Sequence, residues 1–167
     1  MFPIIAGSTA IPEPTYPNDE GIIGYGSTAV SSFLATTNLV SNTGVAGSDV
    51  AGVGTGRNGG AGTEYGGDKG IFGFGGGPYI SSTNLVSNAG VVATDTTGVG
   101  TGRNSISACE YGGDKGIFGY GWDGGVVSMT NLVSNAGVVA TDTTGVGTAR
   151  RQLGSTQYGD DKGIFGY

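Results

Sequence analysis

Hydrophobic and polar positions alternate along this chain with a period of two. In residues 69–75, KGIFGFG, Phe72 and Phe74 fall on one side and Ile71 and Gly73 on the other. Residues 97–102, TGVGTG, alternate Thr or Val with glycine in the same way, as do residues 51–56 and 144–149. No window of ten residues shows a helical stripe, so we predict strands and no helices. The bare glycine faces predict that another backbone or aromatic rings approach closely there.

This pattern repeats along the chain with a period of 46 or 47 residues. The motif TNLVSN begins at residues 37, 83 and 130, and a Gly-Ile-x-Gly motif begins at residues 21, 70, 116 and 163. The segment 66–68, Gly-Gly-Asp, and its counterparts near Gly112 and Gly159 predict tight hairpin turns. Strands are expected to start at Lys69, Lys115 and Lys162. Each repeat is thus expected to hold about four short strands, which are the length and strand number of a β-propeller blade.

Two regions are predicted. Residues 1–18 carry four of the five prolines and are expected to form an extended N-terminal arm, whereas residues 19–167 form a β domain of about three and a half repeats. The apolar head of the arm, with Phe2, Ile4 and Ile5, is expected to dock on a partner or to add an edge strand. A frayed terminus is the alternative. This head lacks a basic start and a long apolar run, so it does not match a secretory signal.

Charge and hydropathy exclude some partners. The formal net charge is −6 and no run of Lys or Arg occurs, so we predict no nucleic-acid partner. The apolar stretches are far shorter than a bilayer requires, so we predict no membrane insertion.

The repeat resembles a known family. The stretch TNLVSNAGVVATDTTGVGTAR followed by YGDDKGIFGY resembles a kelch repeat in its TN start, its TDT motif, its AR element and its last strand. It departs from the kelch pattern because Thr97 or Thr144 replaces the tryptophan, and because an aromatic residue splits the Gly-Gly doublet. The resemblance implies a kelch-like β-propeller. The repeats are also similar to arrays in tailed-phage fibre and virion-surface proteins, which implies a non-enzymatic structural component of a virion.

The number of repeats bears on assembly. A closed propeller needs about four to eight blades, and incomplete repeats at both ends are expected to leave unpaired strand edges. Two chains could complete a ring of about seven blades. One chain could close a four-bladed ring with its arm, or several chains could wrap into a prism or fibre. We therefore expect a homo-oligomer that contacts other virion proteins through the arm.

Several residues recur in phase and are candidates for structural or binding roles. Between repeats, these are Arg57, Arg103 and Arg150, and Tyr65, Tyr111 and Tyr158. We expect the arginines to pair with acids of a neighbouring repeat, with recognition of anionic ligands as the alternative. The tyrosines are expected in the core, with sugar stacking as the alternative. Where the repeats differ most, Tyr79, Trp122 and Asp123 are the candidates for contact with a ligand or partner. Such contacts would make the chain a lectin or adhesin that binds a glycan.

Catalysis and metal binding are not expected. The chain has no histidine, and the only cysteine, Cys109, is replaced by Thr63 and Thr156 in the other repeats. This composition lacks the usual zinc sites and nucleophile–base pairs. The recurring aspartates at positions 49, 95 and 142, and at 68, 114 and 161, could be considered for Ca²⁺, but turn formation explains them. All acids of the repeats are expected in turns, so we predict no enzyme and no cofactor.

Overall fold

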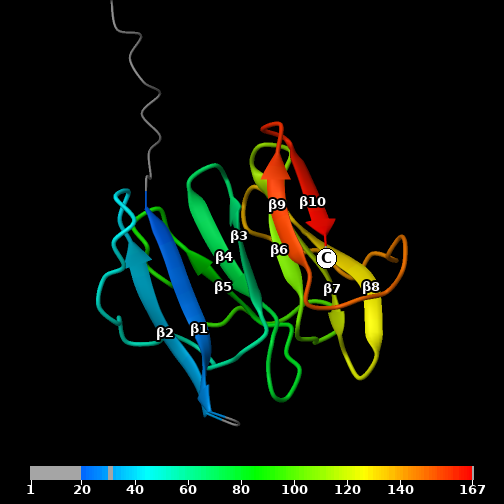
Figure 1. The fold of residues 1–167 in the computed structure, drawn as a ribbon, viewed down its shortest axis with the longest axis horizontal. Coiled ribbons are helices and arrows are strands. Elements are labelled where there is room, and N and C mark those ends of the chain that lie inside the picture. The colour runs from blue at the N-terminus through cyan, green and yellow to red at the C-terminus, as the bar shows by residue number, and fades with distance from the viewer. Residues whose placement is uncertain (1–19, 30–31, 167) are drawn as a thin grey trace, which may run out of the picture.

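The computed structural model describes residues 20–29 and 32–166, and this part of the chain is all-β (Figure 1). It contains ten strands and no helix, which confirms the prediction of an all-β fold. No helix that could cross a bilayer therefore occurs in these ranges. The arm with Phe2, Ile4 and Ile5 lies outside the described residues.

The strands form four small antiparallel sheets. Sheet 1 pairs β1 (Gly21–Ala29) with β2 (Ser32–Val40). Sheet 2 holds β3 (Ala61–Tyr65), β4 (Lys69–Gly73) and β5 (Thr83–Val86), with β4 in the centre. Sheet 3 holds β6 (Ser107–Tyr111), β7 (Lys115–Trp122) and β8 (Val126–Val133), with β7 in the centre. Sheet 4 pairs β9 (Gly154–Tyr158) with β10 (Lys162–Gly166).

The sheets follow one another in chain order across the molecule (Figure 1). Strand β3 contacts β6 and β7 of the next sheet, and β6 in turn contacts β9 and β10. The predicted turns are present, since Tyr65 pairs with Lys69 across residues 66–68. The three lysines begin β4, β7 and β10 as predicted.

The glycine-alternating segments are not strands, contrary to the prediction. Residues 97–102 lie outside every strand, and only isolated bridges from Thr83 to Thr96 and from Val86 to Val92 join the preceding segment to β5. Gly90 and Gly100 have φ angles of +71° and +80°, in the left-handed region that a continuous strand does not use. Each sheet therefore has at most three regular strands, and a bridged segment lies alongside β2, β5 and β8 of sheets 1 to 3.

Phe72 and Phe74 do not share a face, again contrary to the prediction. Phe74 has a φ of +60° and lies just beyond the end of β4, so the alternation stops before it. The Phe72 ring lies 5.3 Å from the ring of Tyr25 in sheet 1. The Phe74 ring lies 5.2 Å from the ring of Phe118 in sheet 3. The two rings therefore contact opposite neighbouring sheets.

Glycines make these ring contacts possible. A Cβ atom built on Gly73 would lie 2.9 Å from Cζ of Phe118, and one built on Gly119 would lie 3.0 Å from Cζ of Phe165. In the glycine-alternating segment, a Cβ atom on Gly98 would overlap the backbone of Ser81. The close approach of rings and backbone to the glycine faces is confirmed.

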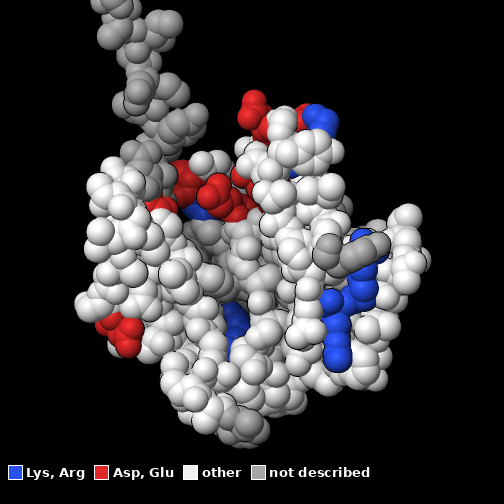
Figure 2. All heavy atoms as spheres, viewed as in Figure 1, with Lys and Arg blue, Asp and Glu red and all other residues white. Residues whose placement is uncertain are grey.

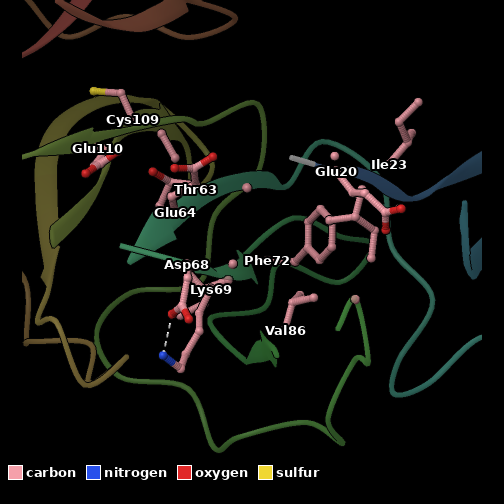
Figure 3. Close-up of a pocket in the computed structure, with 18 of the residues that line it drawn as sticks. Glu20, Ile23, Thr63, Glu64, Asp68, Lys69, Phe72, Val86, Cys109 and Glu110 are labelled. Carbon is pink, nitrogen blue, oxygen red and sulfur yellow. Dashed lines mark hydrogen bonds and ion pairs between the residues drawn. The ribbon is translucent and has the colours of Figure 1, made fainter. Parts of the chain in front are cut away.

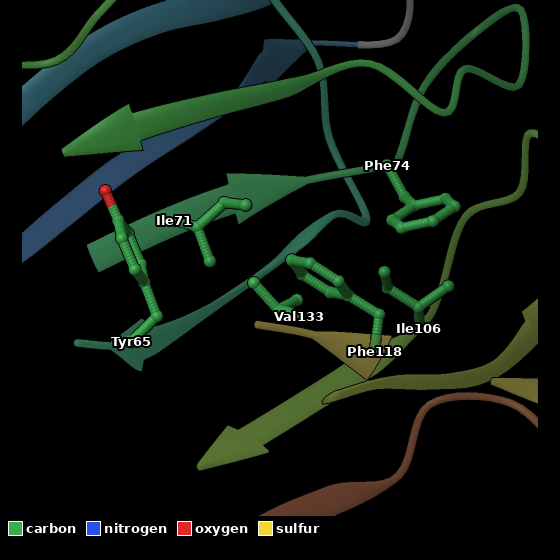
Figure 4. Close-up of a cluster of buried hydrophobic side chains, with 6 residues drawn as sticks. All are labelled: Tyr65, Ile71, Phe74, Ile106, Phe118 and Val133. Atoms are coloured by element: carbon green, nitrogen blue, oxygen red, sulfur yellow. The ribbon is translucent and has the colours of Figure 1, made fainter. Parts of the chain in front are cut away.

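The main core lies between sheets 2 and 3 (Figure 4). Tyr65, Ile71 and Phe74 belong to sheet 2 or directly follow it, and they face side chains of sheet 3 and of the segment before it. Those side chains are Ile106, Phe118 and Val133. Burial of this cluster holds consecutive sheets together by the hydrophobic effect.

Replacing Phe118 tests the role of this core. We expect Phe118→Ala to lower the free energy of unfolding by about 3–5 kcal/mol, because the ring is fully buried and leaves a cavity. Urea unfolding measures the loss. Phe165→Ala is the matched control at the same repeat position, where a partly exposed ring predicts a smaller loss. Equal losses in the two variants would show that the core does not lie between sheets 2 and 3.

Candidate functional site

The arginines of the repeats stack on aromatic rings. The guanidinium of Arg57 lies 4.1 Å from the ring centroid of Tyr25, and that of Arg103 lies 4.4 Å from that of Phe74. Arg150 lies over Tyr120 at 4.7 Å. The Arg57 and Arg103 side chains are fully buried. Cation–π contacts of this kind strengthen when water is excluded.

Each buried guanidinium also reaches the following sheet. Arg103 Nη2 donates to Oδ1 of Asn131 at 2.7 Å, and Arg57 donates to Oδ1 of Asn84 in the same way. Arg103 Nε donates to the carbonyl of Tyr120 at 2.8 Å. An amide is therefore the nearest side-chain partner of Arg103. Asp142, an acid of the neighbouring repeat as expected, lies farther away, with Oδ1 at 3.8 Å from Nη1 of Arg103. Burial lowers the pKa of Arg103 to about 10, and Asp142 acts in the opposite direction, so the side chain stays charged at neutral pH.

The aspartates complete the contact between sheets. Asp142 Oδ1 accepts from Nδ2 of Asn131 at 2.9 Å, while its Oδ2 accepts from the backbone N–H and the hydroxyl of Thr101. We name this set of four residues the inter-sheet clasp. It occurs twice, as Thr55, Arg57, Asn84 and Asp95 and as Thr101, Arg103, Asn131 and Asp142. Two copies of one sequence pattern thus make the same hydrogen bonds between consecutive sheets.

The clasp aspartates are held in their ionised form. Burial raises the pKa of Asp142, but the hydrogen bonds from Asn131 and Thr101 together outweigh it, and the pKa lies below its ordinary value. The pKa of Asp95 is lowered with the same balance of causes. The second set of aspartates, at 68, 114 and 161, pairs with the lysine that follows each one. In the described ranges, no group of three or more Cys, Asp or Glu side chains is placed to hold a metal ion.

The three repeat tyrosines have different surroundings. Tyr65 is buried at 5% exposure, Tyr111 is half-buried, and Tyr158 is 53% exposed. The turn at Gly137 lies against Tyr65, since a Cβ atom on Gly137 would be 2.9 Å from Cε2 of the ring. The core position expected for all three is thus occupied by Tyr65, while Tyr158 faces solvent.

The variable loops bring two of the predicted contact residues together. The indole N–H of Trp122 donates to the hydroxyl of Tyr79 at 2.9 Å. Asp123 instead closes its own turn by accepting from the backbone N–H of Gly125. Arg151, which the sequence did not single out, stacks over the Trp122 ring at 4.4 Å. One ring face of Trp122 is therefore covered, while Tyr79 is exposed.

A hollow of about 660 Å³ lies between the sheets, lined by residues of β1, β3, β4, β6 and β9 among others. Acidic side chains gather at one end of it (Figure 2). The acidic residues that line the hollow are Glu20, Glu64, Asp68 and Glu110, and Lys69 pairs with Asp68 in the same lining. In Figure 3, Glu64 and Glu110 lie beside Thr63 and Cys109, with Phe72 and Ile23 on the other side.

Glu64 and Glu110 correct the expectation that every acid of the repeats lies in a turn. They lie on β3 and β6, directly before the repeat tyrosines. Burial, the charge of Glu64 and a hydrogen bond with it raise the pKa of Glu110. Gln157 holds the same position on β9 and also lines the hollow. The recurrence of Glu, Glu and Gln before Tyr was the available sequence signal for this acidic end.

Cys109 has the environment of a packing residue. Its thiol is buried, and burial raises its pKa. A Cβ atom on Gly163 of β10 would be 2.6 Å from the sulfur, and one on Gly116 would meet the methyl group of Thr63 at the same distance. Cys109 and Thr63 therefore pack against equivalent glycines of the next sheet.

The chain matches no family model and no curated protein sequence.

Glu110 makes the free energy of unfolding of the protein depend on pH. Because its pKa is raised in the folded state, its contribution to stability is present below the ordinary pKa of about 4.3 and is lost as pH rises through the raised value. We therefore expect Glu110→Gln to be more stable than the parent chain at pH 7, by a fraction of a kcal/mol. The gain should vanish near pH 4.

Urea unfolding at the two pH values measures the difference. Asp160→Asn is the control, because it changes the net charge by the same amount on an exposed turn. A Glu110→Gln variant that is less stable than the parent at pH 7, or that gains no more than the control, would contradict the proposed coupling with Glu64.

Proposed function

We propose that this chain is a non-enzymatic structural protein that assembles with further copies of its repeat through sheet edges and inter-sheet contacts. The observation that carries the proposal is the inter-sheet clasp. Its buried arginines and its aspartates form hydrogen bonds that join one repeat to the next. Repeats that bind one another in this way can be joined in succession, as in other repeat proteins.

A kelch-like propeller is the arrangement that we propose for these sheets. The supporting observations are the lateral succession of the sheets and the segment bridged to the outer side of β5. The tryptophan of the kelch pattern is missing. In its place, the arginine–aromatic stacks and the ring pair of Phe74 and Phe118 fill the space between sheets.

We propose a virion as the setting. The support is the similarity of the repeats to arrays of tailed-phage surface and fibre proteins. Contacts with other virion proteins are assigned to the N-terminal arm, and contacts with sister chains to the β domain.

The chemistry of the described residues favours a role without catalysis. Burial raises the pKa of Cys109, which disfavours the thiolate that a nucleophile requires.

A glycan-binding module is the second candidate. It is favoured by the exposed Tyr79 and its hydrogen bond with Trp122, which form an aromatic surface with polar groups. The stacking of Arg151 over Trp122 leaves less ring area for a sugar.

Light scattering together with particle images tests the structural role. We expect masses that are multiples of 16.4 kDa, and symmetric rings, prisms or filaments in the images. A monodisperse species of 16.4 kDa at all concentrations would contradict self-assembly.

The loop variants Trp122→Ala and Tyr79→Ala serve as controls and should assemble as the parent chain does. The same proteins are applied to a glycan array. Binding by the parent chain that both variants lose, without loss of fold, would support the lectin in place of the scaffold.

A further inference from the structure

The variable loops hold an arginine that the repeat itself does not need. Arg151 of the third copy replaces Asn58 and Asn104 of the first two copies. Trp122, over which Arg151 stacks, and Tyr79 likewise occupy positions at which the repeats differ. Because the inter-sheet clasps of the first two copies form without these residue types, contacts between repeats do not explain them. Residues of this kind on a repeated frame are candidates for recognition.

Backbone hydrogen bonds fix the two segments that carry Trp122 and Arg151. The backbone of Trp122 exchanges two hydrogen bonds with that of Asn104, at 2.8 and 3.0 Å. The carbonyl directly before Arg151 accepts from the N–H of Gly121 at 3.0 Å, and the N–H directly after it donates to the carbonyl of Ser105 at 2.9 Å. The main chain is therefore held in place before any ligand arrives, which lowers the entropic cost of binding.

The side chains continue this fixed arrangement. The indole N–H of Trp122 donates to the hydroxyl of Tyr79 at 2.9 Å, and the guanidinium of Arg151 lies 4.4 Å from the Trp122 ring centroid. Arg151 is exposed and forms no hydrogen bond or ion pair with any residue that the structure describes. The oriented N–H donors of its guanidinium thus lack a protein acceptor, in contrast with those of Arg103 in the clasp.

An apolar surface adjoins this guanidinium. Tyr79 is 42% exposed, and Val126, which pairs with Trp122 across the β7–β8 hairpin, is 47% exposed. Directly opposite residues of an antiparallel pair have neighbouring side chains, so Val126 lies beside the indole. Such groups offer apolar contact to the C–H face of a sugar ring, whereas a guanidinium binds a carboxylate through two parallel hydrogen bonds.

We propose that Tyr79, Trp122 and Arg151 form a binding site for a sugar that carries a carboxylate. The carboxylate accepts hydrogen bonds from Arg151, and the sugar ring packs against Tyr79 and Val126. This inference names the ligand class for the glycan-binding candidate, on which it rests, and it does not depend on self-assembly. The net charge of −6 gives the protein no general attraction for anions, so binding has to come from this local arrangement.

Trp122 reports on the site directly, because it is the only tryptophan of the chain. Its fluorescence is followed at constant ionic strength as trigalacturonic acid, or its neutral methyl ester, is added to the full chain. Sialyllactose and lactose form a second pair of acidic and neutral probes. We expect a saturable change with at least one acid, and binding of its neutral counterpart that is weaker by about tenfold or more.

Two results of these titrations contradict the inference. One is that neither acid binds, or that each acid binds no better than its neutral counterpart. The other is that sodium acetate gives the same change at the same concentration as the acidic sugar, which would show a plain carboxylate site without recognition of the sugar ring.

Two charge variants of the chain provide a matched pair. Arg151→Gln removes the guanidinium, and we expect it to weaken binding of the acidic sugar by about tenfold or more, because the carboxylate loses its paired donors. Lys162→Gln is the control, because it removes the same charge from an exposed side chain of β10 and should bind as the parent chain does. Circular dichroism checks that both variants fold. Equal weakening in the two variants would reduce the effect to net charge and overturn the site.

The outcomes separate this inference from the functions proposed above. Acidic and neutral sugars that bind equally, with loss of binding in Tyr79→Ala, would keep the glycan-binding candidate and remove the preference for a carboxylate. A chain that assembles in light scattering but binds no sugar retains the structural role and loses this inference.

Discussion

The structure depends on the burial of a guanidinium group between consecutive sheets. A charge removed from water is costly unless hydrogen bonds and favourable electrostatics replace its hydration. Arg103 meets this requirement only when two sheets come together, because Phe74 lies on one side of it and Asn131 on the other. The same holds for Arg57 between Tyr25 and Asn84. A single repeat cannot satisfy its own arginine, so the sequence favours repeats that associate.

Glycine is what lets the sheets approach closely enough for this contact. The ring of Phe118 lies against Gly73, and any side chain at that position would push the two sheets apart. The aromatic pairs then supply apolar contact where the arginine supplies polar contact. The high glycine content of the chain is consistent with this close packing.

Sequence periodicity predicted the strands, the hairpin turns and the absence of helices, because these depend on local alternation and turn chemistry. It failed for the glycine-alternating segments, since the pattern does not tell an extended glycine from one with positive φ such as Gly100. It also misplaced Phe74, whose positive φ turns the ring to the next sheet. The acidic hollow was missed because Glu64 and Glu110 meet only when repeats pack side by side. The glycine faces predicted that other groups approach closely, but which side chains meet between sheets is set by the packing of whole repeats, which local patterns do not encode.

A double-mutant cycle between Arg103→Met and Asn131→Ala measures the central contact most directly. If the guanidinium and the amide stabilise each other across sheets 2 and 3, the coupling free energy from urea unfolding should be about 1–3 kcal/mol. Strictly additive losses, within about 0.5 kcal/mol, would contradict the account.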